Sequence, residues 1–265
     1  MEILGFIASI FIGIALGLIG GGGSILTVPV LVYLFALDAV TASAYSLFIV
    51  GFTSAVGSVS YFKTGLVNIK TAMIFGIPSV AAIFFTRTYI IPAIPKEVFS
   101  VGIFVVTKSI LMMLLFALLM LFASYRMIKK CNDCNEIDTQ IPKINILLIL
   151  FQGFFVGFVT GLVGAGGGFL IIPTLVNLLK LPMKIAVGTS LLIITINSLL
   201  GFLFSLHHII IDWIFLLSIS GIAIIGILMG SHFSTKIEGE KLKPAFGLFV
   251  LMMGIYIIFK ETIIK

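Results

Sequence analysis

Long apolar stretches are the feature of this chain that most restricts its fold. Of its 265 residues, 60% are apolar and only 10% are charged, whereas soluble domains have roughly 45–50% apolar and about 25% charged residues. Most stretches reach the roughly 20 residues that a helix needs to cross a hydrocarbon core, and they lack the short alternating pattern of a membrane β-barrel. Because lipid cannot satisfy free backbone groups, helices are the expected spanning form. The sequence therefore predicts an all-α polytopic protein of the cell (plasma) membrane.

An internal repeat divides the chain. Gly17–Ser24 (GLIGGGGS) aligns without a gap with Gly161–Gly168 (GLVGAGGG), an offset of 144 residues, and the same offset places Pro29 on Pro173. Self-similarity at a fixed offset indicates repeated units. We expect a first transmembrane repeat over residues 1–125, a polar, cytoplasmic central loop over 126–143, and a second transmembrane repeat over 144–265.

Each repeat contains about five apolar segments, and the second segment of each is too short to span a membrane by itself. It is better explained as a half-helix that completes, or re-enters beside, the segment before the glycines. The expected segments are 3–19, 25–37, 41–62, 69–91 and 98–125 in the first repeat, and 144–163, 169–179, 184–206, 212–233 and 242–259 in the second.

Basic residues in the loops indicate how the repeats are oriented. If the short segment crosses the membrane, each half makes five passes, the halves are inverted, and the charges divide unevenly between the two sides. One side then holds Lys63, Lys70, Arg126, Lys129, Lys130, Lys143, Lys180, Lys184, Lys236, Lys241 and Lys243, and the other Arg87, Lys96, Lys260 and Lys265. If it does not cross, the charges divide almost evenly. The positive-inside rule favours inverted repeats with both termini outside.

The glycine clusters are the strongest candidates for a functional site. Consecutive glycines cost a helix about 1 kcal/mol each relative to Ala, and non-helical backbone at membrane depth is tolerated only inside protein or beside a wet cavity. Matching breaks in two repeats indicate the central site of a transporter. Half-helices beginning near Ser24 and Phe169 would direct N–H groups and positive dipole ends at an anion there. Close helix packing is the alternative.

Packing is the preferred explanation for the isolated glycines Gly13, Gly57, Gly157, Gly201, Gly226 and Gly230. A nucleotide site is excluded because neither cluster has the Lys-Ser/Thr of a P-loop. The candidate substrate-binding residues are Gly20, Gly21, Gly22, Gly23, Ser24, Gly164, Gly166, Gly167, Gly168, Ser46, Ser190, Asn197 and Lys108.

The polar candidates each have a structural alternative. Ser46 and Ser190 occupy matching positions and would line one cavity, although serines also bond back to their own helix. Asn197 is costlier to leave unpaired in hydrocarbon. Lys108 lies within an apolar run and would supply a counter-charge for an anion, unless the span begins near Ser109 and the lysine extends to the surface.

Other charged or reactive residues have simpler explanations. Arg87 is interpreted as an anchor that extends to the membrane surface, and Asp38 as part of a helix N-cap. His207 and His208 could serve proton coupling, but a polar interfacial turn is the preferred explanation. Cys131 and Cys134 form a lone C-x-x-C in a loop without histidine, so no metal site or cofactor is expected.

The duplicated Gly-x-x-Gly-x-Gly-Gly pattern, Gly17 to Pro29 and Gly161 to Pro173, resembles the sulfite exporter TauE/SafE family over essentially the whole chain. The resemblance implies a secondary transporter that exports small sulfur oxyanions or organosulfonates, such as sulfite or sulfoacetate, driven by the proton gradient. Ala165 and Ser24 replace glycines of the pattern. The expected partners are a small anionic substrate, protons and membrane lipid, with no nucleic acid, because the basic residues are scattered through loops.

Three other classes remain to be weighed. An anion channel would need a continuous polar pore lining, and intramembrane polar residues are sparse here. A membrane enzyme would need clustered catalytic groups, and the chain has no histidine box, Ser-His-Asp set or intramembrane carboxylate pair. A membrane sensor of sulfur or redox state could use the loop cysteines.

Overall fold

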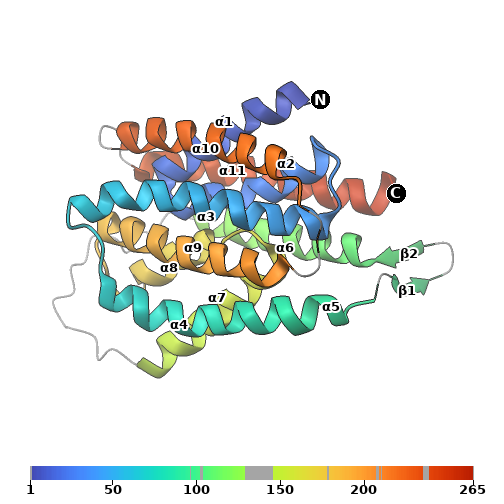
Figure 1. The fold of residues 1–265 in the computed structure, drawn as a ribbon, viewed down its shortest axis with the longest axis horizontal. Helices are drawn as coiled ribbons and strands as arrows, with labels where there is room; N and C mark the ends of the chain where they lie inside the picture. The colour runs from blue at the N-terminus through green and yellow to red at the C-terminus, as the bar shows by residue number, and fades with distance from the viewer. Residues whose placement is uncertain are drawn as a thin grey trace.

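The computed structural model describes residues 2–95, 97–101, 104–128, 146–177, 179–206, 209, 211–234 and 239–264, which form a bundle of helices (Figure 1). The first half contains α1 (Glu2–Ile19), a 3-10 stretch η1 (Gly20–Leu26), α2 (Thr27–Tyr33), α3 (Ala39–Lys63), α4 (Ile69–Phe85), a π-helical turn η2 (Thr86–Ile90), α5 (Ile91–Ala93), β1 (Glu97–Val101), β2 (Phe104–Thr107) and α6 (Lys108–Ile128). The second half contains α7 (Ile146–Val163), α8 (Gly168–Asn177), α9 (Met183–Ser205), α10 (Trp213–Ser234), α11 (Gly239–Phe259) and a π-helical turn η4 (Lys260–Ile264).

The helical membrane class is confirmed. Five helical stretches of the described chain are long and apolar enough to cross a membrane: Ala39–Lys63, Ile69–Ala93, Lys108–Tyr125, Met183–Ser205 and Trp213–Ser231. The helices next to the glycine clusters are shorter, as the sequence predicts. The chain is thus a multi-pass membrane protein.

The fifth predicted segment, 98–125, is wrong in its first third. Residues 97–107 contain an antiparallel β-hairpin in which Val101 pairs with Phe104, and the helix begins only at Lys108. The run is rich in valine and phenylalanine, which favour strands as well as membrane helices. Hydropathy alone could not distinguish the two.

Side-chain caps set the starts of three long helices. The Asp38 carboxylate accepts from the Val40 N–H, which confirms its predicted place at the α3 N-cap. Asn68 caps α4 by accepting from the Thr71 N–H, and Asp212 precedes α10 and accepts from the Phe215 N–H. Each such bond satisfies a backbone donor that a helix start leaves free.

Helices α3 and α9 run antiparallel through the centre of the bundle. A Cβ added at Gly201 would lie 3.1 Å from Leu47 Cδ1, and one added at Gly57 would lie 3.6 Å from Leu191 Cδ1. Gly201 is the repeat equivalent of Gly57, and Leu191 is the repeat equivalent of Leu47. Each glycine therefore meets the equivalent leucine of the other half.

The pairs α1–α10 and α4–α7 are related by the same 144-residue offset. A Cβ at Gly13 of α1 would overlap the Ala223 carbonyl oxygen of α10, and one at Gly157 of α7 would overlap the Ser79 carbonyl oxygen of α4. Farther along, Gly161 faces Thr86, so α4 and α7 run parallel. The isolated glycines therefore permit close helix packing, as expected.

The chain direction follows from these contacts. We call the end of the bundle where α3 begins the Asp38 end and the opposite end the Asn68 end. Helix α9 ends and α10 begins at the Asp38 end, and α1 lies parallel to α10, so α1 also starts there. Figure 1 shows both termini at one end of the bundle.

The short helices reverse the chain. Helix α7 begins at the Asn68 end beside α4, and α8 is followed within a few residues by α9, which begins at the Asn68 end beside Tyr61. Helix α8 therefore returns toward the end from which α7 came, and α2 returns to the Asp38 end in the same way. Inverted repeats would give this arrangement. The sidedness in the membrane and the domain boundaries stay predictions, and most of the loop 126–143 lies outside the described residues.

Candidate functional site

The two glycine breaks touch each other where the halves of the molecule meet. A Cβ added at Gly21 would overlap the Gly168 Cα, and one added at Gly168 would overlap the Gly21 Cα. A Cβ added at either glycine would also lie 2.6 Å from Ile194 Cδ1. The structure therefore places Gly21 and Gly168, one candidate residue from each cluster, in contact.

A left-handed backbone is common to both breaks. Gly20 has φ +70° and its repeat equivalent Gly164 has φ +79°, a region in which a side chain is strained. Only the second break continues in this conformation, at Gly166 (φ +66°) and Gly167 (φ +70°). The first break instead winds into the 3-10 stretch η1.

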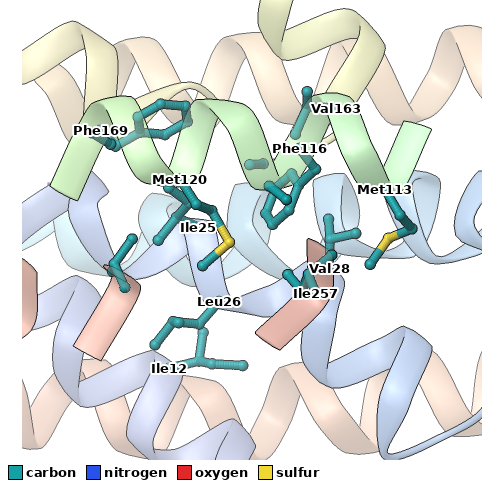
Figure 2. Packing of buried hydrophobic residues seen from close by; sticks show 14 of the residues in the cluster. Ile12, Ile25, Leu26, Val28, Met113, Phe116, Met120, Val163, Phe169 and Ile257 are labelled. Carbon is teal, nitrogen blue, oxygen red and sulfur yellow. The ribbon is translucent and has the colours of Figure 1, made fainter. Parts of the chain in front are cut away.

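Both breaks border one apolar cluster. Ile25 and Leu26 after the first break and Phe169 after the second are buried in it, together with Met113, Phe116 and Met120 of α6 (Figure 2). The Ser24 hydroxyl donates to the Gly21 carbonyl at 2.7 Å, and thus satisfies a backbone group inside the break. The surroundings of Gly22 lie outside the described residues.

The second break has polar neighbours. A Cβ added at Gly166 would lie 2.9 Å from Ser198 Oγ, and one at Gly167 would overlap Thr160 Oγ1. One at Gly164 would overlap the Ser43 carbonyl oxygen. The Ser198 and Thr160 hydroxyls are buried and have no hydrogen-bond partner among the residues that the structure describes.

Arg87 lies next to this break, and its interpretation as a surface anchor is wrong. Its side chain is 3% exposed. Nη1 donates to Ser43 Oγ at 3.1 Å and to Ser205 Oγ at 3.4 Å, and both hydroxyls in turn donate to carbonyls of their own helices. Nε and Nη2 have no partner within the described part of the chain. A buried guanidinium is therefore held by two hydroxyls, with two donor atoms unused.

Local sequence explains how Arg87 is presented. It lies in the π-helical turn η2, just before Pro92. Proline lacks an N–H and its ring displaces the preceding turn, and π-helical turns within helices are often found at functional sites. Two sequence signals point to Arg87 without deciding whether it is buried: it lies near the end of a long apolar run, and its repeat equivalent is Ser231, which could not serve as a charged anchor.

The other polar candidates are placed less uniformly. Ser190 donates to the Val187 carbonyl of its own helix, whereas the buried Ser46 hydroxyl has no described partner. The Asn197 Nδ2 donates to Ser79 Oγ at 2.7 Å, and its Oδ1 is unpaired among the described groups. The structure thus leaves Ser46 and Asn197 with unused polar atoms.

Lys108 is the first residue of α6, and its ammonium donates to the Ile91 carbonyl at the start of α5. No contact between Lys108 and either glycine break is recorded among the described residues. His207, His208, Cys131 and Cys134 lie outside the described residues.

Two cavities open at opposite ends of the bundle. The one at the Asp38 end has a volume of about 470 Å³ and is lined in part by Tyr45 and Asp212. The one at the Asn68 end has a volume of about 370 Å³ and is lined in part by Asn68. The Asp212 N–H donates to Tyr45 Oη at 2.7 Å, and the Asn68 N–H donates to Thr189 Oγ1 at 3.0 Å. These bonds are repeat equivalents, and Asp212 and Asn68 are the equivalent residues that line the two cavities.

The family model of the sulfite exporter TauE/SafE matches residues 5–257 of this chain. The chain belongs to the sulfite exporter TauE/SafE family. Similar proteins include the probable membrane transporter protein YunE of Bacillus subtilis (strain 168), which is 28% identical over an alignment of 280 positions that covers 97% of this chain and 98% of that protein. A probable membrane transporter protein of Xylella fastidiosa (strain 9a5c) is 28% identical over 94% of this chain and 92% of the relative.

The probable membrane transporter protein YdhB of Bacillus subtilis (strain 168) is 25% identical over 94% of this chain and 96% of its own length. No solved structure matches the chain significantly. Family and relatives together identify this TauE/SafE member as a membrane transporter.

Proposed function

We propose that this protein is a secondary transporter that exports small sulfur oxyanions or organosulfonates, such as sulfite or sulfoacetate, driven by the proton gradient. The observation that carries the proposal is the contact between the two breaks at Gly21 and Gly168. Broken helices that meet between two repeats are the usual place of substrate and ion sites in such carriers. The family membership supports the substrate class.

Alternating access would connect the contact between Gly21 and Gly168 to each end of the bundle in turn. A cavity lies at each end, and none of the described lining residues of either cavity belongs to a glycine break. The repeat-equivalent bonds Asp212–Tyr45 and Asn68–Thr189 lie beside these cavities. Rocking one repeat against the other would deepen one cavity toward the breaks and close the other.

Flux measurements test this function. The full chain is placed in proteoliposomes, and the flux of labelled sulfite and a panel of sulfonates is followed with and without a pH gradient. We expect saturable flux of at least one of these anions, accelerated by the gradient. Fast, unsaturable anion current would show a channel, and the absence of flux for every anion tested would contradict the proposal.

A further inference from the structure

We propose that the anion binds asymmetrically, against the second glycine break, on the unused edge of the Arg87 guanidinium. The inference rests on the proposed function only for the chemical class of the ligand. It assigns the site to one repeat, although the glycine breaks occur in both.

The first step is the chemistry of the guanidinium. Arginine stays protonated in proteins and carries five N–H donors in a planar fork. Ser43 and Ser205 use Nη1, whereas Nε and Nη2 are unpaired within the described chain. Nε and Nη2 form one edge of the plane, and two parallel N–H donors on one edge fit two oxygens of the same carboxylate, sulfonate, sulfite or phosphate.

The second step is the cost of the arrangement. The Arg87 side chain is only 3% exposed. Within the described part of the chain, no carboxylate pairs with it. A buried charge without a counter-charge is destabilising, and an intramembrane cation by default indicates function. A bound anion would supply the missing charge and the missing acceptors together.

The third step is the position. Arg87 Nη1 bonds to Ser43, and the same Ser43 packs directly against Gly164. The preceding residue Thr86 packs against Gly161, with 2.8 Å from an added Gly161 Cβ to the Thr86 Cβ. The break then leads into the ten-residue helix α8, whose start adds a positive dipole end on the same side. Cation and helix start therefore flank one break.

The fourth step is the contrast with the first repeat. The positions equivalent to Arg87, Ser43 and Ser205 are Ser231, Val187 and Tyr61. Gly20 accordingly packs near Val187 Cγ1, at 3.0 Å from an added Cβ, where Gly164 packs on a serine. The first break has neither the cation nor the hydroxyls that hold it, so one anion per chain is expected.

The test is anion-dependent thermal stabilisation of the full chain purified in detergent, with sulfite and methanesulfonate at constant ionic strength and chloride as the reference. Binding to the folded state raises the unfolding midpoint with ligand concentration. We expect both anions to stabilise the natural protein. Arg87→Gln should weaken the apparent affinity about 100-fold or more, as for loss of one partner of a buried, hydrogen-bonded charge pair.

Two further variants separate the site from a structural role. Arg87→Lys keeps the charge but loses the planar fork, so about tenfold weaker binding is expected. Ser231→Ala changes the equivalent position of the first repeat and should leave the affinity within about twofold, as for a substitution outside the site. A purely structural arginine predicts a different pattern: a lower midpoint for Arg87→Gln without anion, and equal stabilisation by anions afterwards.

The outcomes distinguish this inference from the proposed function. Equal anion affinity in Arg87→Lys and the natural protein would overturn the inference, even if Arg87→Gln failed to fold. Sulfite flux that persists unchanged in Arg87→Gln would overturn the inference and leave the transport function standing. Arg87-dependent binding in a protein that transports no anion would support the inference and overturn the proposed function.

Discussion

The two glycine breaks share a backbone conformation but differ in what surrounds them. Gly20 and Gly164 both have positive φ, yet Gly20 packs on the apolar side chain of Val187 and Gly164 on Ser43, which accepts from Arg87. Residues that follow each break, Ile25 and Leu26 after the first and Phe169 after the second, lie in one apolar cluster with α6 (Figure 2). The left-handed glycine is therefore present in both breaks, whereas the buried arginine and its serines are present at only one.

The different surroundings of the two breaks suggest different roles, although the two glycine patterns look alike in the sequence. Glycines in a membrane break can serve packing, or they can present backbone groups to a ligand. The contact between Gly21 and Gly168 shows packing at the junction of the halves. The second break has in addition the unpaired Ser198 hydroxyl next to Gly166, and the Arg87 partner Ser43 next to Gly164. We infer that the first break serves mainly packing and that the second break holds the ligand.

The largest expected effect distinguishes the two equivalent glycines. Gly20→Ala should destabilise the protein by about 1–2 kcal/mol, the cost of a side chain in the left-handed region, because the nearest atoms are side chains at 3.0 and 3.1 Å. Gly164→Ala adds a clash with the Ser43 backbone, worth about 1–3 kcal/mol more. Thermal unfolding in detergent measures both. Equal losses of stability in the two variants would mean that Gly164 is packed no more tightly than Gly20.

A smaller effect is expected at another equivalent pair. Asn197 donates to Ser79 across two helices and keeps an unused Oδ1, whereas its equivalent Thr53 bonds back to the Ile49 carbonyl. Asn197→Ala should slow sulfite flux about tenfold, consistent with roughly 0.6–1.7 kcal/mol for an interhelical polar contact. Thr53→Val serves as the matched control and should change the rate less than about twofold. Equal effects of the two variants would show that Asn197 and Thr53 contribute equally to transport, which would contradict an asymmetric site.

The smallest effect on anion binding is expected at Lys108. Its ammonium already donates to the Ile91 carbonyl, so Lys108→Met should change the sulfite affinity less than about twofold and cost about 1 kcal/mol of stability through the lost bond. Methionine is the residue at the equivalent position 252. Titration of sulfite by thermal stabilisation gives both values. A tenfold loss of affinity would restore Lys108 as the counter-charge.

Much of the architecture was predictable from sequence, because hydropathy and a 144-residue repeat are strong, local signals. The apolar runs predict the helices, the glycine clusters predict the breaks, and Asp38 marks the start of α3. The β-hairpin before Lys108 was not predictable, since Val98 to Val106 suits a strand and a membrane helix equally well.

The site was predictable only in outline. The glycine clusters can be found in the sequence alone, but the burial of Arg87 depends on which face of α4 meets α3 and α9. Helix orientation about its own axis is set by packing with distant segments, such as Gly157 on Ser79. A lone arginine near the end of an apolar run is therefore ambiguous until those contacts are known.

The central claim, one anion on the second break, is tested most directly by locating a bound selenium oxyanion. A crystal structure with selenite in place of sulfite would show the selenium by its anomalous scattering. The account predicts a single peak with oxygens within hydrogen-bond reach of Arg87 Nε and Nη2, and none beside Val187. A peak at the first break, or a pair of peaks related by the repeat, would contradict it.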